Sequence, residues 1–397
     1  MSKDLSAQIR SSNEALIRFT QVHGPSESYI RELDIQVGQG DHEKYVQEMK
    51  LLGEKVLFCT GSRAMRAAGF LDQYLSLFKQ EGFKVRHYDD ISANPTLKQM
   101  VKGVGVANDF QPDFIFALGG GSTIDTAKAI AAGAYGDLWK YVIGESTIEQ
   151  AIPIVALSTT SGTGSHLTPY AVVTNTDTLE KRTLKHPLLC PKRSLVDIEI
   201  LESMPKRTLA ETGFDVLAHA AEVFTRTDST EASTEASITA LQLIRENLVG
   251  SYNEDIPQNK LGMAFADIYA GIALALVGTH VPHAISHPIS ARHEQISHGQ
   301  TLAYLLPETF RVQRDKLNPA LNYKFEIVSD ELGGSSDICR TLLNFTKLLG
   351  LDNRKSFSSD DRANILNDTM GYRYGSVLKS PVTLSRDDIE LIIKNSL

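Results

Sequence analysis

The hydrophobic pattern of this 397-residue chain changes once, near residue 204, and that change limits the folds it can adopt. Before it, short β-branched and aromatic runs alternate with stretches whose apolar residues recur at helical spacing. Such alternation is typical of a parallel sheet covered by helices. The predicted strands are 55–60, 84–88, 113–118, 153–157, 171–174 and 194–197.

After residue 204 the strand pattern stops, and the remaining sequence predicts helices only. The clearest of them are 208–225, 231–249, 263–277 and 299–310. We therefore expect an α/β domain over 29–203 and an all-α domain over 204–397. Residues 1–28 are polar with a helical pattern, and we expect them to form an N-terminal extension whose role the sequence does not reveal.

The composition excludes several classes of function. Apolar residues are 42% and charged residues 22% of the chain, as in globular proteins, which excludes disordered and fibrous architectures. A net charge of −8 gives no attraction to nucleic acid or to an anionic membrane. We find no apolar run near the roughly 20 residues of a membrane-spanning helix. Three cysteines and an N-terminus without an apolar core favour a cytoplasmic protein.

A glycine-rich segment, LGGGSTIDTAK at 118–128, follows a predicted buried strand and opens a helix. In that position backbone N–H groups and the helix dipole bind phosphate, and glycines allow a pyrophosphate to approach closely. The alternative is that Ser122 and Asp125 form an ordinary capping box. The pattern favours a phosphate. Gly103 and Gly105 lie on a helical pattern without a preceding strand, so we do not expect them to bind one.

Two further segments carry groups that bind metals. Asp215 and His219 are four residues apart on an apolar helix, so their side chains share one face. Such a pair is often only a surface hydrogen bond, but a buried carboxylate needs a partner, and a metal would be one. Five of the eleven histidines fall within 280–298, and imidazole is a common metal ligand. Of these five, we expect His280 and His293 to be structural or solvated.

One aspartate and two or more histidines from separate helices suit Fe²⁺ or Zn²⁺ acting as a Lewis acid. A dinucleotide loop in one half of the chain and a metal in the other fit one kind of chemistry. That chemistry is hydride transfer to or from a carbon whose oxygen lies on the metal.

Together these motifs resemble those of the iron-containing (group III) alcohol dehydrogenase family, from about residue 30 to near the C-terminus. The resemblance rests on GGGSxxD at 119–125, STTSGTGS at 158–165, GxDxxxHxxE at 213–222, and HxxxHP at 283–288 followed by HG at 298–299. It implies a Rossmann-like N-terminal domain and a helical C-terminal domain, a dehydroquinate synthase-like architecture. It also implies a metal-dependent, NAD(P)-linked alcohol dehydrogenase or aldehyde reductase.

The resemblance implies functional residues as well. The metal ligands would be Asp215, His219, His283 and His298. His287 would lie near the nicotinamide and the substrate oxygen, where it could relay a proton. The coenzyme contacts would be Gly61, Ser62, Asn94, Gly120, Gly121, Ser122, Asp125, Thr159, Thr160, Thr163 and Lys181. The implied partners are a small alcohol or aldehyde and further copies of the chain, in a homodimer or larger assembly.

The chain departs from the family pattern at two places. His166 stands where members usually have Glu, directly after the threonine-rich loop at 158–165. The stretch between His283 and His298 is one residue longer than in common members, which leaves His293 as an alternative ligand.

The residue after the strand 55–60 bears on coenzyme choice. NAD-preferring members carry an Asp there, whose carboxylate bonds the ribose 2′-hydroxyl, but this chain has Gly61, followed by Ser62 and Arg63. Without the carboxylate a 2′-phosphate is not repelled, and Ser62 and Arg63 could donate to it. We therefore favour NADP(H) over NAD(H). The alternative is that Gly61 merely makes the turn and Arg63 points to solvent.

Two other functions stay open at the level of sequence. One is an enzyme similar to glycerol dehydrogenase or dehydroquinate synthase, which use three protein metal ligands on the same architecture. The other is a non-catalytic sensor of nucleotide or metal, which turnover of any aldehyde would dismiss. The sequence specifies neither the substrate nor the choice between iron and zinc.

Overall fold

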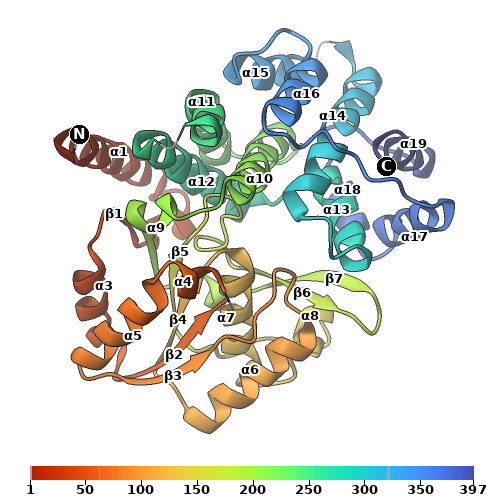
Figure 1. Cartoon of the computed structure of the whole chain (residues 1–397). Helices are drawn as coiled ribbons and strands as arrows, with labels where there is room; N and C mark the ends of the chain where they lie inside the picture. The colour runs from red at the N-terminus through yellow and green to blue at the C-terminus, as the bar shows by residue number, and fades with distance from the viewer. Residues whose placement is uncertain (1, 62, 255, 320–321) are drawn as a thin grey trace. The chain divides into compact units, whose positions relative to one another are not determined.

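The computed structural model describes residues 2–61, 63–254, 256–319 and 322–397, so the predicted coenzyme contact Ser62 lies outside the described residues. The chain divides into two compact units, Met1–Met204 and Pro205–Leu397 (Figure 1). Each unit is described below by itself.

The first unit is built around a six-stranded sheet in the order β1-β8-β5-β4-β2-β3, with every neighbouring pair parallel. This confirms the parallel sheet predicted from strand–helix alternation. Its strands are β1 (Ile35–Gly38), β2 (Lys55–Thr60), β3 (Lys84–Tyr88), β4 (Phe114–Gly119), β5 (Ile154–Ser158) and β8 (Arg193–Asp197). The sequence did not predict β1, because four residues at the edge of a sheet are too short for a clear pattern.

Alternate residues of the strands face two separate helical layers. On one face, Phe58 and Phe116 pack with buried residues of α3 (His42–Glu48) and α5 (Phe70–Gln80). On the other face, strand residues such as Ile115 pack with α6 (Leu97–Phe110) and α7 (Gly121–Gly133). Because both faces are covered, the central strands are apolar along nearly their whole length. Gly103 and Gly105 lie on α6, as expected.

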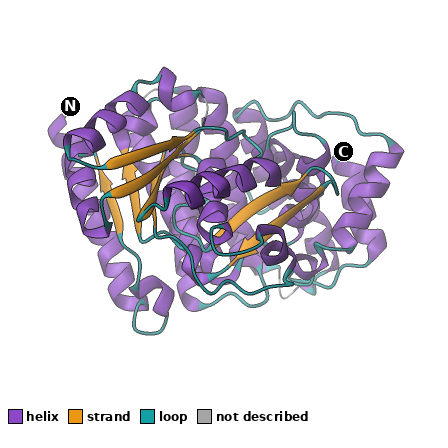
Figure 2. Ribbon diagram, turned by 90° about the horizontal axis from the view of Figure 1, so that it is seen from below, coloured by secondary structure: helices purple, strands orange, loops and turns teal. Residues whose placement is uncertain are grey.

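The predicted strand 171–174 does not join the parallel sheet, contrary to expectation. It forms β6 (Tyr170–Asn175), which pairs antiparallel with β7 (Glu180–Lys185) as a separate two-stranded sheet (Figure 2). The sequence did not predict β7, because EKRTLK is too polar to be recognised as a strand. The hairpin packs against α7 and α8 (Leu138–Ile143).

The remaining elements of the first unit are short, apart from its first helix. They are α1 (Ser2–His23), α2 (Ser28–Arg31), α4 (Ala64–Ala67), α9 (Ile198–Glu202) and the 3₁₀ helices η1 (Met49–Leu52) and η2 (Pro187–Leu189). The helix α1 lies within the polar segment 1–28 and buries one apolar face, which includes Leu5, Leu16 and Phe19.

The second unit contains helices and no strand among its described residues, as the sequence predicted. Its helices are α10 (Lys206–Thr225), α11 (Glu231–Asn253), α12 (Pro257–Val277), α13 (Val281–Arg292), α14 (His298–Lys316), α15 (Tyr323–Glu331), α16 (Ile338–Leu348), α17 (Ser359–Met370), α18 (Tyr374–Val377) and α19 (Arg386–Ser396). An α/β unit followed by an all-α unit is the predicted fold class.

The expectation that no apolar run approaches the length of a membrane-spanning helix was wrong. The helix α12 has 21 residues and is long and apolar enough to cross a membrane. However, most of it is buried inside the structure, and it packs against α10 and α11. A buried core helix has the same composition, so packing within the second unit accounts for this apolar run.

Candidate metal and coenzyme sites

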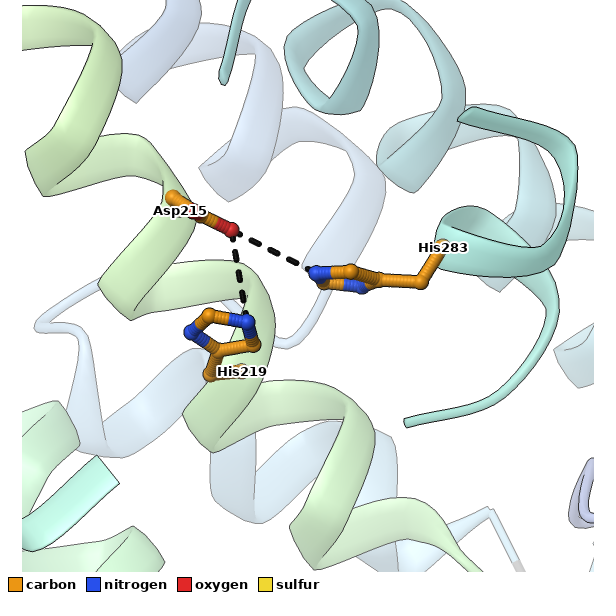
Figure 3. Close-up of side chains that lie close together, drawn as sticks. All are labelled: Asp215, His219 and His283. Atoms are coloured by element: carbon orange, nitrogen blue, oxygen red, sulfur yellow. Dashed lines mark ion pairs between the residues drawn. The ribbon is translucent and has the colours of Figure 1, made fainter. Parts of the chain in front are cut away.

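Three of the four predicted metal ligands meet in the second unit. Asp215 and His219 lie one turn apart on α10, and His283 reaches them from α13 (Figure 3). The Oδ1 atom of Asp215 lies 3.5 Å from Nε2 of His219 and 3.3 Å from Nε2 of His283. One ligand atom from each residue lies within 4.8 Å of the other two, and all three side chains are buried.

The helix α10 buries these groups because its sequence is apolar around them. From Gly213 to Thr225 every residue is buried, and the helix packs against α11, α12 and α14. The sequence predicted this burial from the alanine, valine and leucine residues that flank Asp215 and His219.

The fourth predicted ligand, His298, is the first residue of α14. Its Nε2 lies 3.9 Å from Oδ1 of Asp215, and its ring centroid lies 5.1 Å from that of His283. Its Nδ1 lies 2.8 Å from the hydroxyl of Ser286 on α13. Its side chain is 25% exposed, so it is the most accessible of the four.

The donor set fits a divalent transition metal. Oδ1 of Asp215 and Nε2 of His283 are both buried and make no hydrogen bond, although they lie close together. A buried carboxylate requires compensating positive charge. Three imidazole nitrogens and one carboxylate oxygen are ligands that suit Fe²⁺ or Zn²⁺.

The electrostatics of the cluster favour positive charge. Burial raises the pKa of the Asp215 carboxyl, but the imidazoles of His219, His298 and His283 outweigh burial and hold that pKa well below its ordinary value. Burial lowers the pKa of the His283 imidazole, but the carboxylates of Glu222 and Asp215 outweigh it, so that pKa lies above its ordinary value. The two carboxylates therefore stabilise a cation at the imidazole nitrogens.

Glu222 has a role that the sequence did not assign. It is fully buried on α10, and its Oε1 accepts a hydrogen bond from Nδ1 of His283 at 2.6 Å. Its Oε2 accepts the backbone N–H of His280 at 2.8 Å. A hydrogen bond at Nδ1 fixes the tautomer and leaves Nε2 of His283 to bind a metal. The sequence signal for Glu222 was its spacing from Asp215 and His219, because residues 215, 219 and 222 share one helix face.

Glu222→Gln is expected to weaken metal binding about 10- to 100-fold, the usual effect of losing a partner that orients a ligand. The amide has the same size but lacks the charge that fixes the ring of His283. Equilibrium dialysis against buffered Zn²⁺ measures the affinity. The control is Glu246→Gln, an exposed glutamate on α11, which should bind as the wild type does. Equal affinity in both variants would contradict the role of Glu222.

The other histidines of the cluster lie at different places. His287 is buried one turn beyond His283 on α13, with its ring centroid 5.7 Å from that of His298. His280 is fully buried, begins α13 as its N-cap and lies 3.0 Å from the Thr225 hydroxyl. Nε2 of His293 lies 3.4 Å from Asp361 of α17, and its ring packs edge-on against that of Phe357.

In the first unit, the glycine-rich segment ends β4 and begins α7. Gly120 is the N-cap of α7, and no side chain caps the helix. The Ser122 hydroxyl instead donates to the carbonyl of Ala93 at 2.5 Å. The capping box considered for Ser122 and Asp125 is therefore not formed. A helix N-terminus without a capping side chain fits a phosphate.

The glycines of this segment pack against the threonine-rich loop that follows β5. A Cβ on Gly121 would lie 2.7 Å from Thr163, and one on Gly120 would lie 3.0 Å from Oγ1 of Thr160. The backbone N–H of Thr159 donates to the Gly119 carbonyl at 3.2 Å. Oγ1 of Thr160 is buried and makes no hydrogen bond, so a polar atom of a ligand fits beside it.

Asp125 and Lys128 of α7 fix the same loop. The carboxylate of Asp125 accepts the Ser165 hydroxyl at 2.6 Å and the backbone N–H of Val172 at 3.0 Å. The fully buried Nζ of Lys128 donates to three backbone carbonyls, those of Ser165 at 2.6 Å, Thr168 at 2.8 Å and Tyr170 at 2.7 Å. In the structure both carboxylate oxygens of Asp125 bond to protein donors. Its contact with a coenzyme stays a prediction.

Two other predicted coenzyme contacts meet near the N-terminus of α7. Nζ of Lys181, on β7, donates to Oδ1 of Asn94 at 3.1 Å. Asn94 directly follows Ala93, whose carbonyl accepts the Ser122 hydroxyl. The turn at 93–95 therefore links α7 to the β6–β7 hairpin.

Gly61 directly follows β2. Its φ is not positive, and a Cβ there would meet only Oγ1 of Thr123, at 3.7 Å. Neither the turn nor the packing of the described residues therefore requires glycine, which weakens the alternative that Gly61 merely makes the turn. Arg63 is exposed.

Family sequence profiles match both units. The profile described as iron-containing alcohol dehydrogenase matches residues 34–198. The profile for the C-terminal part of the Fe-containing alcohol dehydrogenase family matches residues 209–354. Together the two matches cover more than half of the chain.

Individual relatives are about a third identical to the chain. Aldehyde-alcohol dehydrogenase 2 of Entamoeba histolytica is 31% identical over 69% of this chain, but the match spans only 33% of that longer protein. The NADPH-dependent butanol dehydrogenase of Clostridium saccharobutylicum is 30% identical over 69% of this chain and 71% of its own length. The probable NADH-dependent butanol dehydrogenase 2 of Bacillus subtilis is 30% identical over 72% and 75%.

Solved structures share the fold. The crystal structure of an archaeal halo-thermophilic alcohol dehydrogenase from a Red Sea brine pool superposes with a TM-score of 0.89 and 31% identity, over 92% of this chain and 97% of that one. This likeness confirms the predicted fold class.

Proposed function

Since this chain belongs to the iron-containing alcohol dehydrogenase family, we propose that it is a metal-dependent, NAD(P)-linked enzyme that interconverts a small alcohol and its aldehyde. One observation carries the proposal: Asp215, His219 and His283 converge in the second unit, with His298 beside them. The N-terminus of α7, which has no capping side chain, supports a dinucleotide in the first unit. Butanol dehydrogenases among the relatives make short aliphatic alcohols the first substrates to test.

Four side chains would hold the metal: Asp215, His219, His283 and His298. Fe²⁺ is the favoured ion, and Zn²⁺ suits the same donors. Once bound, the metal supplies Lewis-acid polarisation of the substrate oxygen. Glu222 keeps His283 oriented with Nε2 toward the ion. The position of His298, 3.9 Å from Asp215, supports four protein ligands rather than the three expected of the rival enzymes.

His287 would move the proton of the reaction. It is buried one turn beyond His283, close to the ligand cluster without belonging to it. Alcohol oxidation releases a hydride to the nicotinamide and a proton from the hydroxyl group, and aldehyde reduction takes both up. An imidazole can accept a proton at one nitrogen and release it from the other, which suits His287 to this relay.

Titration and turnover test the proposal. The Fe²⁺-loaded protein is titrated anaerobically with NADPH and separately with NADH, with nicotinamide fluorescence as the signal. It is then assayed with short aliphatic aldehydes, butanal first. We expect coenzyme binding and aldehyde-dependent oxidation of the nicotinamide. If neither coenzyme binds, the oxidoreductase function is wrong, and binding without any turnover would favour a sensor.

We propose NADP(H) as the preferred coenzyme, and Gly61→Asp is expected to shift the preference toward NAD(H) by about tenfold or more, or 1.4 kcal/mol. The new carboxylate would repel a 2′-phosphate and bond a 2′-hydroxyl. The variant should fold, because among the described residues a Cβ at this position meets Thr123 alone, at van der Waals distance. The ratio of kcat/KM for NADPH and NADH measures the shift. If the wild type prefers NADH, the proposed preference for NADP(H) is wrong, but the proposed dehydrogenase activity is not contradicted.

We also propose that the protein forms a homodimer or larger homo-oligomer and that it lies in the cytoplasm. Sedimentation of the purified protein tests the oligomeric state, and fractionation of cells tests the location.

A further inference from the structure

A second cluster of metal-binding groups lies in the first unit, among residues that the proposed reaction does not use. His42 begins α3, Asp197 ends β8, and Glu199 belongs to α9. One ligand atom from each lies within 4.8 Å of the other two. The cluster forms because β1 and β8 pair in parallel, with Gly38 opposite Asp197. The turns that follow the two strands are therefore neighbours.

His42 presents one ring nitrogen to this cluster. The residue is only 4% exposed, and its Nδ1 lies 2.8 Å from the hydroxyl of Tyr74. Its Nε2 is buried, makes no hydrogen bond, and lies 3.4 Å from Oε2 of Glu199. A hydrogen bond at one nitrogen that orients the other is the usual setting of a metal-binding histidine.

Asp197 brings a fully buried carboxylate to the same place. Its Oδ1 accepts backbone N–H groups of Gly40 and Glu199, and its Oδ2 accepts that of Asp41. Each carboxylate oxygen has two lone pairs, so Oδ2 retains capacity for a cation. It lies 3.9 Å from Nδ1 of His42, the ring nitrogen that faces Tyr74, and the three residues each bring one ligand atom to within 4.8 Å of the other two.

The carboxylates of this cluster lack a permanent cation. Among the described residues, no lysine or arginine forms an ion pair with Asp197 or Glu199, and both pair only with His42. A divalent cation would supply the missing positive charge.

We propose that His42, Asp197 and Glu199 bind a divalent transition metal, with Zn²⁺ the first to test. One imidazole and two carboxylates are ligands that zinc accepts. Two ligand atoms that each lie about 2.1 Å from a tetrahedral zinc are about 3.4 Å apart. This matches the 3.4 Å between Nε2 of His42 and Oε2 of Glu199. The Glu199 side chain is 51% exposed, so water can complete the coordination. The ion ties the turn after β1 to the turn after β8 and stabilises this edge of the sheet.

Zinc stoichiometry tests the site independently of the proposed enzyme function. Each chain is dialysed against buffered Zn²⁺, and the bound metal is determined by mass spectrometry. We expect two ions per wild-type chain and one per His283→Ala chain, in which the Asp215 cluster is disabled. Adding Glu199→Gln to His283→Ala should remove the remaining ion. Glu199 is half exposed, so its substitution leaves the core unchanged.

The matched control is Glu43→Gln, which removes an exposed carboxylate next to His42 on α3 and should leave the stoichiometry unchanged. Thermal unfolding gives a second readout. Zn²⁺ should raise the Tm of the His283→Ala chain and leave that of His283→Ala with Glu199→Gln unaffected, because a ligand stabilises only the state that binds it. The proposal is overturned if the wild type binds one ion that His283→Ala removes. It is also overturned if the second ion persists without Glu199.

Discussion

His283→Ala is expected to abolish metal retention by the Asp215 cluster and to lower turnover about 10³-fold or more, because a Lewis-acid metal supplies several kcal/mol and each 1.36 kcal/mol is tenfold in rate. Nε2 of His283 lies 3.3 Å from Oδ1 of Asp215, at the centre of the ligand cluster. Its loss leaves a buried carboxylate with two imidazoles instead of three. Coenzyme binding should persist, because the predicted coenzyme contacts belong to the first unit. Metal content, kcat and nicotinamide fluorescence measure the three quantities separately.

Two further variants separate metal binding from folding. Alanine also removes the donor to Glu222, so His283→Asn is the better substitution, since its amide N–H can replace Nδ1–H beside that buried carboxylate. It should fold and still lose the metal of the Asp215 cluster. His293→Ala removes a histidine that lies beside Asp361 and should keep both metal and activity. Full turnover in His283→Asn would refute the ligand assignment. Loss of metal in His293→Ala would instead make His293 a ligand.

For the candidate metal site, local geometry predicted Asp215 and His219. His283 and His298 were predicted as ligands only through family resemblance. Asp215, His219 and Glu222 share a face of one helix, and helical spacing alone reveals such an arrangement. Which histidines of 280–298 approach that face depends on how α13 and α14 pack against α10, and no local pattern carries that information. The resemblance supplied His283 and His298. The structure then separated them from His293, whose partner Asp361 lies far along the chain.

The same limit applies to the sheet. The strands β2 and β4 were predicted because helices cover both faces and the sequence is apolar along nearly the whole of each strand. The strand β7 was missed because its sequence is polar and only Lys181 and Leu184 are buried; among the described residues it pairs with β6 alone. The pairing of β6 with β7, rather than with the parallel sheet, depends on contacts with α7 and α8. A strand pattern in the sequence predicts that a strand forms, but it does not predict which strand pairs with it.

Gly299→Ala is expected to displace the start of α14 and take His298 away from Asp215. A Cβ on Gly299 would lie 1.9 Å from the backbone oxygen of Glu211 and 2.5 Å from its carbonyl carbon, on the turn of α10 that precedes Asp215. The backbone of a helix cannot rotate aside as the end of a flexible side chain can. We therefore expect the free energy of unfolding to fall by about 3 kcal/mol, the upper part of the range for overpacking. Metal affinity should fall with it. Chemical denaturation and equilibrium dialysis measure the two effects.

Comparison with two other variants assigns the cause. His298→Ala removes the ligand without the steric conflict, so it should weaken metal binding and leave the apoprotein nearly as stable as the wild type. Gly375→Ala adds a Cβ on α18 that meets nothing within 4 Å, so it should change neither quantity unfavourably. If Gly299→Ala loses stability but binds metal normally, then His298 does not depend on the close approach of α14 to α10. If it loses both, the glycine that follows His298 in the sequence is there because the metal site requires two helix backbones in contact.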